Sequence, residues 1–142
     1  MAWADARDVL HGHVEGLGYD VFAIHPRALQ VLNAVQIVMP PPAFETGQDE
    51  GMAFRDLTFT QTIAVLHAIG GDEFRVADAV HAAALAITDA IAPDATLGAT
   101  AKEVGDIRWT EGEVEEDETG QEYLVMRAEL AIVLSYPFRA SS

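Results

Sequence analysis

The chain has 142 residues, half of them apolar, which is enough for one folded domain with its own core. Its 23 acidic and 8 basic residues give a formal net charge of -15, which argues against binding nucleic acid through phosphate contacts. There is no cysteine, so disulfides, thiolate catalysis and cysteine-based zinc sites are excluded. We expect a single domain over residues 1–142.

The N-terminal residues and the apolar runs show no targeting or membrane signal. Residues 1–17 contain four charged side chains and therefore lack the apolar centre of a signal peptide. The longest uncharged run, residues 28–44, is interrupted by polar side chains and three prolines, so it cannot form a spanning helix. These features predict a soluble protein of the cytosol.

The first predicted elements are a helix and a short strand. Apolar side chains recur at helical spacing from Trp3 to Leu17, with glycines at positions 16 and 18 at the helix exit. The next run, Tyr19 to Ile24, is extended in character and is followed by a His-Pro pair, which predicts a weak edge strand.

A proline block follows the second predicted strand. Residues 29–39 are apolar and become β-branched towards their end, which predicts a strand. Pro40, Pro41 and Pro42 then stop sheet pairing and hold the backbone in a stiff extended form. This block could dock against another chain, although a stiff turn explains it without a partner. Residues 43–51 are polar and contain two glycines, which predicts a loop.

The stretch from Phe54 to Ala92 organises the predicted fold as a long strand, a Gly-Gly turn and a long helix. Residues 57–69 alternate between two registers and are rich in β-branched side chains, which predicts a strand. Asp72 is the expected N-cap of the helix, which should end before Pro93. Its apolar positions recur at helical spacing: Phe74, Ala77, Val80, Ala84, Ile87 and Ile91.

The last third predicts two more strands joined by a charged hairpin. Residues 101–109 resemble a strand with a bulge at Gly105. Residues 110–122 contain seven acidic side chains around a Thr-Gly pair and predict a hairpin connection with a charged tip. Residues 123–136 alternate clearly, and their even-numbered positions should face the core. Together the elements predict an α+β fold: a mixed, mostly antiparallel sheet of four to five strands with two main helices packed on one face.

The predicted long strand has two different faces. Its odd-numbered positions should pack under the helix, which leaves Thr58, Thr60 and Thr62 as either a subunit interface or the wet face of a half-exposed strand. From Ala64 onward both faces are apolar, so this half should be covered on both sides, either within the subunit or by a neighbouring one. The candidate interface residues are Thr58, Thr60, Thr62, Leu66, Pro40, Pro41 and Pro42.

The sequence contains no recognisable catalytic, cofactor-binding or metal-binding pattern. Its three serines lie outside any nucleophile motif, and no glycine pattern matches a phosphate loop. The acidic run of residues 111–118 lacks the ligand spacing of a calcium loop. The five histidines also lack metal-ligand spacing and are expected to be ordinary half-buried side chains: His11, His13, His25, His67 and His81.

The order and spacing of these elements, over nearly the whole chain, resemble the small tail-terminator, or tail-completion, proteins of long-tailed bacteriophages, particularly those that infect actinobacteria. The matching features are the N-terminal helix, the strand 35–39 with its proline block, the Thr-rich strand that ends at Gly70-Gly71, the Ala-rich helix 73–92, the Ala-Thr-Leu-Gly segment 95–98 and the final strand 123–136.

The resemblance implies a structural α+β subunit and not an enzyme, with no cofactor. Such a protein assembles, usually as a hexameric ring, on the last ring of the major tail tube protein, stops tube growth, and presents a surface to the head-tail connector or stopper protein. It would be part of the virion at the tail neck, and would lie in the host cytoplasm before assembly. DNA would pass through the ring without specific binding, which agrees with the acidic charge.

Two alternatives stay open. The first is another neck component, such as a head-closure protein. The second, from a different class, is a small acidic ligand-binding domain or enzyme that would use His67, His81 and nearby carboxylates.

Overall fold

The computed structural model describes residues 2–24, 27, 29, 32–50 and 54–137. These residues form two helices and eight strands in one sheet, an α+β fold as predicted. The elements are α1 (Trp3–Glu15), β1 (Asp20–Phe22), β2 (Gln36–Val38), β3 (Ala43–Glu50), β4 (Phe54–Ala68), α2 (Glu73–Ile91), β5 (Glu103–Val104), β6 (Arg108–Trp109), β7 (Glu113–Glu116) and β8 (Glu122–Pro137). Neither helix is long and apolar enough to cross a membrane.

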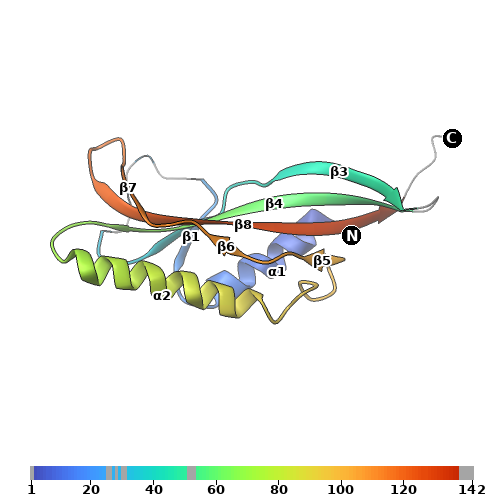
Figure 1. Ribbon diagram of the computed structural model, residues 1–142, viewed down its shortest axis with the longest axis horizontal. Helices are drawn as coiled ribbons and strands as arrows, with labels where there is room; N and C mark the ends of the chain where they lie inside the picture. The colour runs from blue at the N-terminus through green and yellow to red at the C-terminus, as the bar shows by residue number, and fades with distance from the viewer. Residues whose placement is uncertain (1, 25–26, 28, 30–31, 51–53, 138–142) are drawn as a thin grey trace.

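Two long antiparallel strands, β4 and β8, form the centre of the sheet and pair along the whole of β4 (Figure 1). Strands β2 and β3 pair one after the other with β4, and β5, β6 and β7 pair one after the other with β8. Strand β1 is parallel to β2 at the edge, so the predicted mixed, mostly antiparallel sheet is confirmed. The predicted number of four to five strands is wrong. The segment beside β4 is divided into β2 and β3 by the proline block, and the segment beside β8 is divided into β5, β6 and β7.

The predicted polar loop after the prolines is also wrong, because Ala43–Glu50 is strand β3. This strand pairs antiparallel with the first half of β4, with a register shift between Thr46 and Asp49. The acidic side chains and the glycine of this segment indicated solvent exposure and therefore a loop. A strand at the edge of a sheet can have exposed side chains, however, because it requires only hydrogen-bond partners for its backbone. The first half of β4 supplies those partners.

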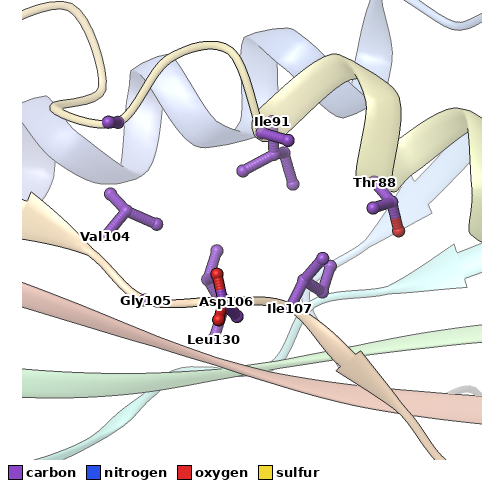
Figure 2. A pocket seen from close by; sticks show the side chains of 9 residues that line it. Thr88, Ile91, Val104, Gly105, Asp106, Ile107 and Leu130 are labelled. Atoms are coloured by element: carbon purple, nitrogen blue, oxygen red, sulfur yellow. The ribbon is translucent and has the colours of Figure 1, made fainter.

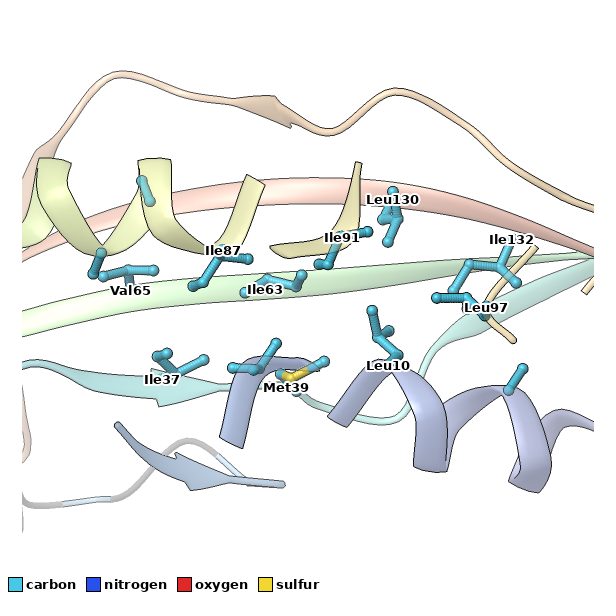
Figure 3. Packing of buried hydrophobic residues seen from close by; sticks show 14 of the residues in the cluster. Leu10, Ile37, Met39, Ile63, Val65, Ile87, Ile91, Leu97, Leu130 and Ile132 are labelled. Atoms are coloured by element: carbon cyan, nitrogen blue, oxygen red, sulfur yellow. The ribbon is translucent and has the colours of Figure 1, made fainter. Parts of the chain in front are cut away.

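The main hydrophobic core lies between one face of the sheet and both helices, as predicted (Figure 3). The odd-numbered positions of β4 and the even-numbered positions of β8 supply its floor, through residues such as Ile63, Val65, Leu130 and Ile132. Leu10 of α1 and the buried stripe of α2 close it from the other side. Both helices therefore leave the opposite face of the sheet free of helical cover (Figure 1).

Helix α2 begins at the predicted N-cap, and four of its six predicted apolar positions are buried, whereas the first of them, Phe74, is not. The Asp72 side chain accepts a hydrogen bond from the backbone N–H of Arg75 at 3.1 Å, as an N-cap should. Val76 and Ala83 are buried, whereas Phe74 is 86% exposed. Position 74 lies about 200° around the helix from Val76, so an apolar residue there faces solvent.

The loop after α2 contains three consecutive residues with left-handed backbone: Leu97, Gly98 and Ala99. Only glycine adopts this conformation without a steric cost, which is about 1–2 kcal/mol for other residues. Leu97 is fully buried in the main core, and this burial offsets the steric cost of its left-handed backbone. Exposed Ala99 has no such packing role.

Replacing Ala99 with glycine is therefore expected to stabilise the protein by roughly 0.5–1 kcal/mol, since glycine relieves the strain at φ 65°. The midpoint of urea unfolding is the measurement. The matched change Ala82→Gly, at an exposed position in the middle of α2, should instead cost about 1 kcal/mol. Loss of stability in both variants would show that the loop is not strained at Ala99.

Candidate functional site

The open face of the sheet carries the threonine row predicted from the sequence. Thr58, Thr60 and Thr62 point away from the helices and are each half-buried. Thr60 lies directly between Ala43 of β3 and Ala131 of β8, and Thr58 lies beside Val133 of β8. We call this surface the threonine face and define it as Ala43, Thr58, Thr60, Thr62, Ala131 and Val133.

None of the six residues of the threonine face is charged, and charged residues surround it. On one side Lys102 donates to the carboxylate of Asp56 at 3.1 Å. On another side, a shallow depression of about 590 Å³ is lined by Thr60, Thr62, Arg108 and Glu129, among others. The six residues therefore form a small uncharged patch with charged neighbours in the sheet itself: Glu45 of β3 pairs with Thr58, and Glu129 of β8 pairs with Thr62.

Leu66 lies on the same side of the sheet but is fully buried. It belongs to a second apolar cluster with Ala64, Ala68, Tyr123 and Val125, packed against Leu29 and the half-buried Phe22. The prediction that this half of the strand is covered on both sides is confirmed, and the cover comes from the same chain. Leu66 is thus not part of the accessible surface next to the threonine face.

The proline block is tied to the core by a buried glutamine. The side-chain amide of Gln61 donates to the carbonyl oxygens of Pro40 at 2.7 Å and Thr62 at 2.9 Å. Gln61 is only 1% exposed, so these bonds satisfy a polar group that would otherwise be costly to bury. Pro41 is exposed and Pro42 is half-buried, which leaves the block at the surface between β2 and β3. The role of Gln61 was not predicted from the sequence, although a polar residue at a core-facing position of the predicted strand indicates a buried hydrogen bond.

An ion pair fixes the charged hairpin on the open side of the sheet. Arg127 donates to both carboxylate oxygens of Glu115, at 2.7 and 2.8 Å, and the Tyr123 hydroxyl donates to the same carboxylate at 3.1 Å. Burial and the bond to Glu115 raise the pKa of Tyr123, and the bond to Glu115 raises the pKa of Arg127. The predicted hairpin is present, and its first arm is strand β7.

The tip of this hairpin is held by Asp117. One carboxylate oxygen accepts bonds from the N–H and hydroxyl of Thr119, at 2.9 and 2.6 Å, and from the N–H of Gln121 at 3.0 Å. The other accepts from the N–H of Leu29 at 2.9 Å, which attaches the tip to the cover of the second cluster. These bonds, with that from the Thr119 hydroxyl the strongest, lower the pKa of Asp117 from 3.8 to about 2.

Because the carboxyl pKa is lower in the folded state, Asp117 contributes stability above pH 3.8, and this is lost as the pH falls through about 2. The variant Asp117→Asn is therefore expected to be less stable than the wild type at pH 6, with a smaller difference near pH 2. Urea unfolding of both proteins at several pH values measures this. Glu118→Gln, which removes the next carboxylate but none of these bonds, should be about as stable as the wild type at pH 6; a loss equal to that of Asp117→Asn would contradict the assignment.

The histidines have unrelated surroundings. His67 is 2% exposed and bonds through Nδ1 to the Ala68 carbonyl at 2.7 Å, whereas His81 is exposed on α2. His13 contacts the Asp94 carboxylate at 2.8 Å, and burial lowers the pKa of His11. His25 lies outside the described residues. Within the described ranges, no group of three or more histidines and carboxylates is placed to hold a metal ion.

A cavity of about 400 Å³ lies between the end of α2 and the segment joining β5 to β6. Figure 2 shows Thr88 and Ile91 on the α2 side, with Val104 and Ile107 on the strand side. Its lining is mostly apolar, and Asp106 is the single charged lining residue. A lone exposed carboxylate without a base or nucleophile beside it gives this cavity no evident chemistry.

Comparisons with known proteins find little sequence similarity. No protein-family model matches the chain, and no curated protein matches it significantly. Among solved structures, one that resembles it is a chain described as "Virion of native gene transfer agent (GTA) particle", with a TM-score of 0.49 and 14% identity over 90% of each chain. At this identity the similarity says nothing about individual residues.

Proposed function

We propose that this protein is a structural subunit of a phage-type tail. It would cap the tail tube, end its polymerisation and join the tail to the head connector, as a ring of identical copies, most simply a hexamer. The order of elements that resembles tail terminators supports this role. The observation that carries it is the threonine face, an uncharged sheet surface left open by two helices that both lie on the other side.

The charge of the molecule restricts where copies can meet. Two chains of net charge -15 repel each other, and this repulsion is strongest where exposed carboxylates approach. At physiological salt such repulsion falls off over about 8 Å, so an uncharged patch with charges at its rim can still form a contact. Of the surfaces discussed, the threonine face meets this condition, and the exposed Pro41 next to β3 would extend it.

A ring also requires that each copy uses two different surfaces, because a contact between the same surface on both partners closes a dimer. In the proposed ring the threonine face of one copy meets a different surface of the next. The acidic exterior that remains suits a channel through which DNA passes without binding.

Assembly with a tail tube protein from the same genome tests the proposal. Analytical ultracentrifugation of the purified protein should show a closed oligomer, alone or after tube protein is added, and negative-stain microscopy should show caps on tube ends. Binding to the head connector without any binding to tube ends would identify another neck component instead. A strict monomer that binds neither would contradict both roles.

A further inference from the structure

Helix α2 carries an outward-facing stripe with two large apolar side chains. Phe74 is 86% exposed and Leu85 is 65% exposed. They are eleven residues apart, so they lie within about 20° of each other around the helix and about 16 Å apart along it. Asp78 and His81 are exposed between them on the same stripe. We call these four residues the outer stripe of α2.

A small groove runs beside the start of this stripe. It has a volume of about 260 Å³ and an apolar floor that includes Val76, Ala77 and Leu124. Val114 of β7 lines it and is 57% exposed. Ala77 lies three residues after Phe74, so the two are neighbours on the helix surface and the groove continues the stripe.

The charges next to the stripe and groove are mainly acidic. Glu73 and Glu122 line the groove, and Asp78 lies within the stripe. A second copy of this chain, also at -15, would meet strong repulsion here. A surface with lysines or arginines around apolar side chains would instead be attracted and could bury Phe74 and Leu85.

We propose that the outer stripe and groove of α2 bind a basic amphipathic helix of a different protein. A helix fits better than a strand, because the exposed apolar side chains follow the axis of α2 and helices pack along such stripes. The groove volume is enough for one large apolar side chain of that helix. This inference stands apart from the proposed function, since the stripe and the threonine face lie on opposite sides of the sheet.

Two synthetic peptides of identical leucine, lysine and alanine composition provide the test. One places its leucines at positions i, i+4, i+7 and i+11 on a single helical face, and the other scatters them. Fluorescence anisotropy with the full-length protein should show that the ordered peptide binds at least tenfold more tightly. The double variant Phe74→Ser/Leu85→Ser should lose at least tenfold of this affinity.

A control double variant, Ile24→Ser/Leu32→Ser, removes two other exposed apolar side chains, which are 78% and 59% exposed. It should bind the ordered peptide as the wild type does. Equal binding of both peptides, or unchanged binding by the α2 variant, would overturn the proposal. Sedimentation of the same α2 variant tests copy–copy assembly separately, and assembly should be unaffected.

Discussion

Replacing Leu66 with alanine is expected to destabilise the protein by about 2–5 kcal/mol, the range for truncating a fully buried leucine. Leu66 has no exposed surface, because Leu29 and Phe22 lie against the apolar cluster that contains it. The alanine leaves a cavity that the long paired strands β4 and β8 cannot easily close. Urea unfolding monitored by circular dichroism measures the change, at a protein concentration low enough to prevent assembly.

The matched control is Thr62→Ala, on the same strand and the same side of the sheet but in the open part. Thr62 is half-exposed, so its truncation should change the stability by no more than about 0.5 kcal/mol. Equal stability of the two variants would show that Leu29 and Phe22 do not cover Leu66 in solution. Leu66 would then again be a candidate interface residue.

The elements with strong periodicity could be predicted from the sequence. Strands β4 and β8 are long enough for alternation to fix both the strand and its core-facing side, and the pairing then follows. Helix α1 and helix α2 were predicted from apolar spacing, and Asp72 from its chemistry as an N-cap. In these cases the local pattern and the tertiary environment agree.

Other features depend on partners that are distant in the sequence. Strand β3 exists because the first half of β4 offers it backbone partners, and its own polar composition indicates only solvent. The burial of Leu66 depends on Leu29, which is attached through its N–H to Asp117 at the hairpin tip. No pattern within any one segment reveals a contact of this kind.

The Asp117 attachment explains why the open side of the sheet is divided into two parts. At one end the hairpin tip holds the cover on the second apolar cluster, so that end is part of the fold. The other end carries the threonine face, with small uncharged side chains suited to close approach of another surface. Stability and assembly are therefore expected to respond to different residues of the same strand.

The substitution Thr60→Glu separates these two properties. Thr60 lies at the centre of the threonine face, between Ala43 and Ala131, so a carboxylate there would be removed from water when copies meet. Removing a charge from water costs several kcal/mol, which corresponds to at least about a hundredfold weaker association. Sedimentation velocity over a range of concentrations should show monomers where the wild type forms oligomers, and tube ends should stay uncapped.

Ala82→Glu is the matched control, because it adds the same charge at an exposed position on α2, on the other side of the sheet. It raises the general repulsion between copies equally, so any larger effect of Thr60→Glu reports on the contact itself. Both variants should remain folded by circular dichroism, since each changes an accessible side chain. If Thr60→Glu and Ala82→Glu assemble equally well, copies meet through a different surface, and the threonine face is only the wet side of the sheet.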